Sequence, residues 1–266
     1  MPAHRYTTNR RNAWPGGTRP FRVAYLSTYP PRECGIATFC EDLITATLHG
    51  DQDGGDPIVV AMESGNHGRE YAWPVALRVD DDWEEQYAAA ADFINDSRVD
   101  LVSIQHEFGI FGGIEGRGLF RFLDRLHVPV VTTLHTVLPE PDERLWENVQ
   151  ALARHSQRLV VMNGLAIDIL HRDYAIDKRK IALIHHGTLP PSLESKEQAK
   201  ERLGLSGRKV ISTFGLVARG KGLQYAIGAL PQILPRHPDT CYVIVGQTHP
   251  GVQLVEKESY REELLR

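Results

Sequence analysis

A glycine-rich turn with a lysine separates an apolar run from an amphipathic run near the end of the sequence. The run 210–214 is rich in β-branched residues and stops at Gly215, and Lys221 and Gly222 precede the amphipathic run 223–234. This pattern predicts a strand, a turn and a helix, and the first N–H groups of a helix attract anions such as phosphate. Lys221 adds a full positive charge, so we interpret the turn as a site for the diphosphate of a nucleotide-linked donor.

The same turn resembles a second phosphate-binding pattern. Residues 215–221 fit G-x-x-x-x-G-K, but the next position is Gly222, where a P-loop carries the Ser or Thr that binds Mg²⁺. The missing hydroxyl disfavours a P-loop. An ordinary strand-to-helix turn, in which Lys221 is merely solvated, is the simpler alternative.

Polar residues that can contact a sugar follow two other apolar runs. His106 and Glu107 follow one run, in a loop that also holds Gly109, and His135 follows the next. Imidazole and carboxylate groups hydrogen-bond to sugar hydroxyls, and a histidine in this position can also act as a general base. The alternatives are a satisfied buried histidine at His106 and a packing or helix-capping role for His135.

Another glycine and the spacing of the histidines complete the candidate chemistry. Gly35 lies between the first expected strand and its helix, where a ligand can approach the backbone, although a plain turn is the alternative. A G-x-G-x-x-G dinucleotide fingerprint is absent. No H-x-x-x-H or H-E-x-x-H spacing links His106, His135 and the pair at 185–186, so we predict that no metal is bound.

Composition narrows the class of protein. The net charge of −4 argues against nucleic acid as a partner, and the three cysteines, an odd number without a C-x-x-C pair, fit a reducing cytoplasm. No apolar run approaches the roughly 20 residues that span a bilayer. Residues 1–20 lack the apolar core of a secretory signal, and we expect a disordered tail there.

Strands that alternate with helices must position these residues. Apolar runs predict strands, and amphipathic runs between them predict helices, among them one that Thr38 would cap. The expected strands are 21–27, 57–62, 75–79, 101–105, 130–134, 159–162, 181–184, 210–214 and 241–245, and the expected helices are 38–48, 82–95, 119–126, 142–155, 166–174, 196–203, 223–234 and 256–266. The alternation predicts an α/β fold with a doubly wound parallel sheet, whose ligands lie beyond the carboxyl ends of the strands.

The strands divide between two expected domains. We assign 21–187 to a Rossmann-like domain, 188–207 to a linker rich in polar residues, and 208–266 to a second Rossmann-like domain. The second has only two strands, too few for a complete doubly wound sheet. We therefore expect a truncated domain.

With these pieces placed, the chain resembles the GT-B glycosyltransferases of the retaining family 4 type, from about Phe21 to its last residue. The segments that carry the resemblance are 27–39, Gln105–Gly109, Thr132–Thr136, Ile184–Gly187 and Phe214–Gly222. It implies an N-terminal acceptor domain (21–187) and a C-terminal nucleotide-sugar domain (208–266) around a cleft.

The resemblance also implies roles for single residues. Gly35 is expected near the donor phosphates, His135 at the donor sugar, and Lys221 with Gly222 on the diphosphate, while His106, Glu107 and Gly109 would contact the acceptor or a sugar. The arginine that the family usually has after its phosphate-strand glycine is replaced by Leu216. Arg219, three residues later, is then the candidate for that contact. The family's Glu-x7-Glu donor motif would lie beyond residue 266.

The expected function is transfer of a hexose, with retention, from a donor such as GDP-mannose or UDP-glucose to a saccharide, lipid-linked or other hydroxyl acceptor. No cofactor or metal is required for this reaction. We expect a cytoplasmic enzyme without a transmembrane segment, for which peripheral membrane contact stays open. The alternatives are a non-catalytic module that binds a sugar or nucleotide, and a sugar-nucleotide epimerase of the same architecture.

Overall fold

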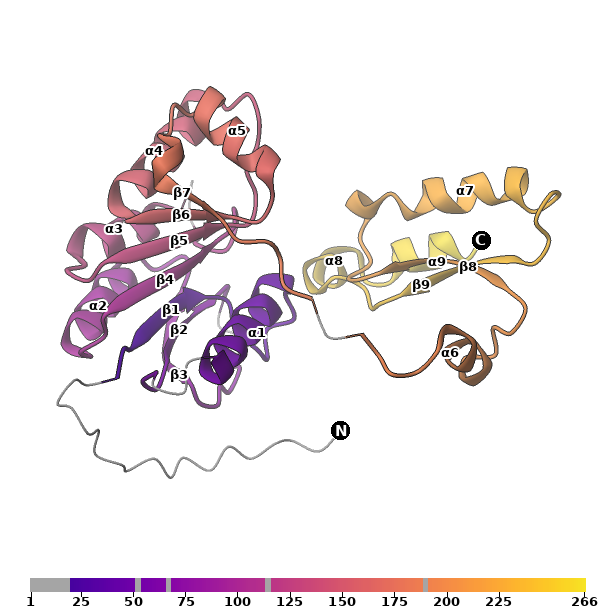
Figure 1. The fold of residues 1–266 in the computed structure, drawn as a ribbon, viewed down its shortest axis with the longest axis horizontal. Helices are drawn as coiled ribbons and strands as arrows, with labels where there is room; N and C mark the ends of the chain where they lie inside the picture. Colours follow the sequence, from indigo (N-terminus) through magenta and orange to yellow (C-terminus); the bar gives the residue numbers. More distant parts are fainter. Residues whose placement is uncertain (1–19, 51–53, 66–67, 113–115, 189–190) are drawn as a thin grey trace. The chain divides into compact units, whose positions relative to one another are not determined.

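Seven short apolar runs pair side by side as parallel strands in the first part of the chain (Figure 1). A computed structural model describes residues 20–50, 54–65, 68–112, 116–188 and 191–266. The strand order is β3-β2-β1-β4-β5-β6-β7, and every neighbouring pair is parallel. The strands are β1 (Val23–Ser27), β2 (Ile58–Glu63), β3 (Val75–Asp80), β4 (Leu101–His106), β5 (Val130–Leu134), β6 (Arg158–Val161) and β7 (Ile181–Leu183).

Helices cover both faces of this sheet. The helix α1 (Gly35–Gly50) packs on one face through Cys40 and Ile44, against Tyr25 and Val59. The opposite face holds the larger apolar core, to which the other four helices contribute. These helices are α2 (Glu84–Asp96), α3 (Arg117–Arg125), α4 (Glu143–His155) and α5 (Gly164–Asp173). This two-sided arrangement follows from right-handed crossovers that run in opposite directions from the central strands.

Most helix starts agree with the sequence, and the start of α1 differs. The side chain of Asp142 caps α4 by accepting a 2.8 Å hydrogen bond from Leu145 N. Thr38, in contrast, lies inside α1, and its N–H donates to Cys34 O at 3.2 Å. The prediction that Thr38 caps this helix is therefore wrong, because backbone bonds already start the helix at Gly35.

The chain divides into two compact units between Gly187 and Thr188. The second unit contains a parallel pair, β8 (Lys209–Phe214) and β9 (Thr240–Val245), joined by α7 (Leu223–Ile233). Its small core consists of Val217, Leu223 and Tyr260. The remaining helices are α6 (Lys196–Arg202), α8 (Pro250–Glu256) and α9 (Ser259–Leu264).

One further expectation has a definite outcome, and another falls almost entirely outside the described residues. The single helix predicted over 256–266 is wrong, because Lys257 adopts a left-handed φ of 54° that separates α8 from α9. The tail predicted over 1–20 lies, except for Pro20, outside the described residues. In the described part of the chain, no helix combines the length and apolar character needed to cross a bilayer.

Candidate functional site

Two adjacent strands in the middle of the sheet bring the predicted polar residues together. The strands β4 and β5 pair in register, with Gln105 beside Thr133 and His106 beside Leu134. Side chains along a strand alternate between the two faces of the sheet, so residues 105 and 106 point to opposite faces. Because β4 and β5 are paired neighbours, the loops that follow them lie together at the carboxyl edge, where parallel sheets bind ligands.

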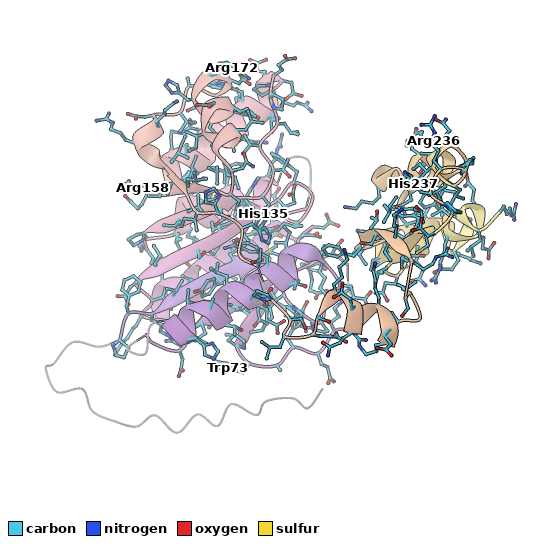
Figure 2. The ribbon with its side chains drawn as sticks, turned by 45° about the vertical axis from the view of Figure 1, so that its right-hand side comes forward. Trp73, His135, Arg158, Arg172, Arg236 and His237 are labelled. Carbon is cyan, nitrogen blue, oxygen red and sulfur yellow. The ribbon has the colours of Figure 1, made fainter. Side chains whose placement is uncertain are left out.

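His135 lies on the face of the sheet that α1 covers (Figure 2). Its Nε2 is 3.0 Å from Gln105 Oε1, and its ring meets the edge of Phe39 with centroids 4.6 Å apart. Burial, and secondly the nearby His186, lower the pKa of His135 to about 4. His135 is therefore a neutral imidazole at neutral pH, and it also lines a small pocket of about 110 Å³.

His106 points into the core of the opposite face. It stacks on Phe111 with ring centroids 5.7 Å apart and meets Phe108 edge-on at 5.2 Å. Its Nδ1 is buried and has no hydrogen-bond partner among the described residues. Burial, with a smaller contribution from His135, lowers its pKa to about 4. His106 is thus a buried neutral histidine, as the alternative interpretation expected, but that interpretation also required a satisfied Nδ1, and none of the described residues satisfies it. Its backbone carbonyl accepts from His135 N at 3.0 Å.

Glu107 connects the two strand ends through its carboxylate. One oxygen accepts from Phe108 N at 2.9 Å, and the other accepts from Thr136 Oγ1 at 2.7 Å. These two hydrogen bonds fix the carboxylate in position. Because the residue is only half-buried, the carboxylate stays within reach of solvent. A carboxylate held in this way can accept hydrogen bonds from ligand hydroxyls without first ordering itself.

Two glycines of the loop after β4 have different roles. Gly109, a predicted contact residue, has a φ of 87°, and a Cβ there would meet no atom within 4 Å. Gly112 has a φ of 59°, and a Cβ there would lie 1.9 Å from the carbonyl oxygen of Asp81. Gly112 is therefore required for packing, whereas Gly109 leaves open space beside the cluster.

Gly35 begins α1 next to the same cluster of strand ends. It is exposed, its φ is not left-handed, and a Cβ there would meet nothing within 4 Å. The helix it begins also carries Phe39, whose ring contacts both His135 and His186, the latter at a centroid distance of 5.2 Å. The start of α1 and the imidazole of His135 consequently belong to one site.

The predicted phosphate turn belongs to the second unit and is described by itself. It forms a short 3₁₀ helix over Arg219–Lys221, and Gly222 follows with a φ of 66° before α7 begins. Lys221 is exposed, and within the described residues it forms no salt bridge. Its side chain is therefore available to an anion.

Arg219, in contrast, is already engaged. Its Nε donates to Glu256 at 3.0 Å, its Nη2 lies 2.8 Å from Glu263, and its guanidinium lies over the ring of Tyr260 at 4.8 Å. These contacts raise the pKa of Arg219 above its ordinary value. The guanidinium holds α8 and α9 against the turn that carries Lys221.

Among the described residues, one set of side chains lies close enough to share a metal ion. It consists of Asp80, Asp81 and Asp82, whose carboxylate oxygens fall within 4.8 Å of one another. They lie at the end of the edge strand β3, which β2 and β1 separate from β4. The predicted absence of a metal from the His135 cluster stays a prediction.

Sequence reasoning left three members of the cluster without a role. The sequence places Gln105 at the end of a buried strand, Phe39 in a helix and Thr136 beside His135. Their contacts join residues 29 to 96 positions apart, as in Thr136 with Glu107 and Phe39 with His135. Only the order of strands in the sheet creates these contacts, so no local pattern identifies them.

Comparisons with known proteins agree with this architecture. Residues 44–188, more than half of the chain, match the family model described as Glycosyltransferase Family 4. A stretch of 52 residues is 35% identical to spore coat protein SA of Bacillus subtilis (strain 168), and it covers 20% of this chain and 14% of that protein.

Solved structures show the fold at low sequence identity. HepE of Anabaena, crystallised in complex with UDP, is similar with a TM-score of 0.60 and 15% identity over 92% of this chain and 66% of HepE. A UDP-forming α,α-trehalose-phosphate synthase from Burkholderia xenovorans, in complex with glucose-6-phosphate, is similar with a TM-score of 0.57 and 13% identity. The similarity covers 91% of this chain and 70% of the synthase. The chain thus spans less than two thirds of HepE and a seventh of the spore coat protein. The predicted GT-B type α/β fold is confirmed.

Proposed function

We propose, because the chain belongs to Glycosyltransferase Family 4, that it transfers a hexose from a nucleotide-sugar donor to a saccharide or other hydroxyl acceptor, with retention of configuration. The observation that carries this proposal is the cluster at the ends of β4 and β5. A neutral histidine and a fixed carboxylate stand there beside the open start of α1. These groups suit a ligand rich in hydroxyl groups.

His135 takes the donor sugar in this proposal. A histidine whose pKa is lowered to about 4 stays neutral at physiological pH and offers one donor and one acceptor nitrogen. Such a ring recognises a hydroxyl without placing a positive charge beside the anomeric carbon, where positive charge develops. Glu107 and Gly109 form the adjoining wall for a sugar or acceptor, with the half-buried Glu107 supplying the hydrogen-bond acceptor, and the buried His106 supports this loop by packing on Phe108 and Phe111.

Lys221, with Gly222 and the start of α7, takes the donor diphosphate. The exposed ammonium and the first amides of an eleven-residue helix both favour an anion. Stabilising the negative charge of the departing nucleotide is then the main catalytic task. Arg219 contributes by holding the turn, and Gly35, in the first unit, opens a helix start that also favours a donor anion.

The remaining features of the proposal follow from this chemistry. Charge stabilisation by Lys221 and helix amides makes a metal or other cofactor unnecessary. The partners are a nucleotide-sugar and a hydroxyl acceptor, without nucleic acid, and a cytoplasmic location would supply such donors. GDP-mannose and UDP-glucose are the first donors to test.

The test is nucleotide binding by the full chain. Calorimetric titration with UDP and with GDP compares wild type, Lys221→Ala and, as a matched control, Lys196→Ala on the exposed start of α6. Loss of a charge-assisted contact is expected to weaken binding at least tenfold, or about 1.4 kcal/mol, in Lys221→Ala alone. Equal affinities of the three proteins for both nucleotides would refute the assignment.

Product analysis separates the alternatives. A transferase forms a glycoside only when acceptor and donor are both present, whereas an epimerase isomerises the donor without an acceptor. A non-catalytic binding module binds the nucleotide-sugar but neither transfers the sugar nor isomerises the donor. The transferase is favoured because the match to its family, over residues 44–188, covers most of the unit that carries His135.

A further inference from the structure

We propose that Gln105 is a positioning residue that keeps the ring proton of His135 on Nε2, so that Nδ1 is left as a hydrogen-bond acceptor for the ligand. The inference rests on the proposed function for the identity of that ligand. The tautomer itself is a property of the free protein.

A short relay of hydrogen bonds along β4 supports this assignment. Gln105 Nε2 donates to Ser103 Oγ at 3.1 Å, which turns the amide oxygen toward the next strand. That oxygen, Oε1, lies 3.0 Å from His135 Nε2. An amide oxygen can only accept, so the nitrogen that faces it must carry the proton.

The fold gives the amide little freedom to turn. Gln105 is fully buried, and Ser103 is also buried two residues earlier on the same face of β4. On the other side, the ring of Phe39 packs edge-on against the imidazole at 4.6 Å. Both partners of the hydrogen bond are therefore held by packing as well as by the bond.

Neutrality of the ring makes the tautomer matter. A charged imidazolium would donate from both nitrogens, but burial lowers the pKa of His135 to about 4. A neutral ring has a single proton, and the nitrogen that does not hold it accepts. With the proton fixed on Nε2, Nδ1 accepts from a ligand hydroxyl.

This polarity predicts a requirement of the donor. The ligand atom that meets His135 must be a hydroxyl that donates, so a sugar with hydrogen or fluorine at that carbon loses the contact. A site built to bond a hydroxyl discriminates strongly against an analogue that lacks it, because a buried polar group is left unpaired. Gln105 would thereby set sugar specificity although it does not touch the sugar.

The direct test is ¹⁵N NMR of the imidazoles in the full chain labelled at histidine. The signals of His135 are assigned by their loss in His135→Gln. In wild type at pH 7.5, Nε2 is expected to resonate as a protonated nitrogen and Nδ1 as an unprotonated one. A protonated Nδ1 would overturn the proposal, because the Gln105 amide would then be turned the other way.

Two substitutions at Gln105 separate positioning from packing. Gln105→Met keeps the length but has no acceptor, so the two tautomers of His135 are expected to mix. Gln105→Glu keeps an acceptor oxygen, so Nε2 is expected to stay protonated, and the midpoint of His135 titration is expected to rise because of the new charge. An unchanged tautomer in Gln105→Met overturns the proposal, and if that variant fails to fold, an unchanged midpoint in Gln105→Glu does so.

The matched control is Thr132→Val on β5. It removes another buried hydrogen bond, the 2.8 Å contact with Ser156 Oγ at the end of α4, on the opposite face of the sheet. The His135 signals of this variant are expected to match those of wild type. If they shift as in Gln105→Met, loss of any buried hydrogen bond in the sheet changes the tautomer, and the specific role of Gln105 is refuted. The NMR measurement needs no nucleotide, so it succeeds or fails independently of the Lys221 titration.

Discussion

Thr136 Oγ1 donates a 2.7 Å hydrogen bond to Glu107 Oε2, and this contact joins the loops that follow β4 and β5. The second carboxylate oxygen accepts from Phe108 N at 2.9 Å. Glu107 is consequently held from two sides before any ligand arrives. Preorganisation of this kind lowers the entropy lost when a hydroxyl binds.

Removal of the Thr136 hydroxyl is therefore expected to weaken saccharide binding. In Thr136→Val the carboxylate gains freedom, and we expect the Kd for a simple glycoside to rise roughly fivefold, the equivalent of about 1 kcal/mol for one hydrogen bond. The measurement is an NMR titration of the Glu107 and Phe108 amides with methyl glycosides of glucose and mannose. Thr136→Ser, which keeps the hydroxyl, should bind like wild type, and equal Kd values for all three proteins would contradict the prediction.

His106 makes the stability of the protein depend on pH. Burial lowers its pKa from 6.5 to about 4 in the folded state. Between these values the unfolded chain binds the proton and the folded chain does not, so the free energy of unfolding falls as pH falls from 6.5 to 4. The contribution is fully present above pH 6.5, and its loss approaches about 3 kcal/mol for a shift of this size.

His106→Phe is expected to flatten this dependence, because Phe packs between Phe108 and Phe111 without titrating. Urea unfolding at pH 7.5 and pH 4.5 measures the difference for wild type and variant. His135 has a pKa lowered in the same direction, so the variant keeps part of the wild-type slope. His127→Phe, at an exposed position, serves as the control, and a His106→Phe slope as steep as that of the control would disprove the assignment.

Gly112 and Gly109 provide a matched pair for stability. Both have left-handed φ values, but only at Gly112 would a Cβ meet backbone, the Asp81 carbonyl oxygen at 1.9 Å. We expect Gly109→Ala to cost about 1 kcal/mol from backbone strain alone. Gly112→Ala is expected to cost more than about 3 kcal/mol because the loop must also move. Denaturant midpoints check this order, and similar midpoints for the two variants would contradict it.

Local sequence patterns predicted the positions of the strands and placed His135 at a strand end. They did not predict side-chain contacts between residues that are distant in the sequence. Alternation of apolar runs with helices predicted the strands β4 and β5, whose ends carry His106, Glu107 and His135. The sequence predicts no role for the Gln105 side chain, because its partner His135 is 30 residues away, directly after the neighbouring strand. Only strand order and register bring the two side chains together.

Two predicted helix boundaries were wrong because backbone geometry, which no side-chain pattern marks, determines them. The helix α1 begins at Gly35 through a backbone bond to Cys34 O, and Thr38 carries the more familiar capping side chain three residues later. Near the end of the chain, Lys257 separates α8 from α9 without a glycine or proline to mark the break. Arg219 pairs with one carboxylate from each of these two helices.

Arg219 is expected to control the rigidity of the turn that carries Lys221. The amide of Lys221 donates to Ala218 O at 3.0 Å, and that of Gly222 donates to Arg219 O at 3.1 Å. When Arg219→Met releases Glu256 and Glu263, these two bonds should open more often. Amide hydrogen exchange at Lys221 and Gly222 is therefore expected to be faster than in wild type.

The control for this prediction is Arg236→Met, which removes an exposed guanidinium of the same unit after α7 (Figure 2). Exchange in that variant should match wild type at both amides. Because a mobile turn presents Lys221 less often in the binding geometry, UDP affinity should also fall in Arg219→Met while the ammonium itself is intact. Unchanged exchange together with weaker UDP binding would instead mean that the Arg219 guanidinium contacts the phosphates directly, and it would contradict the positioning role.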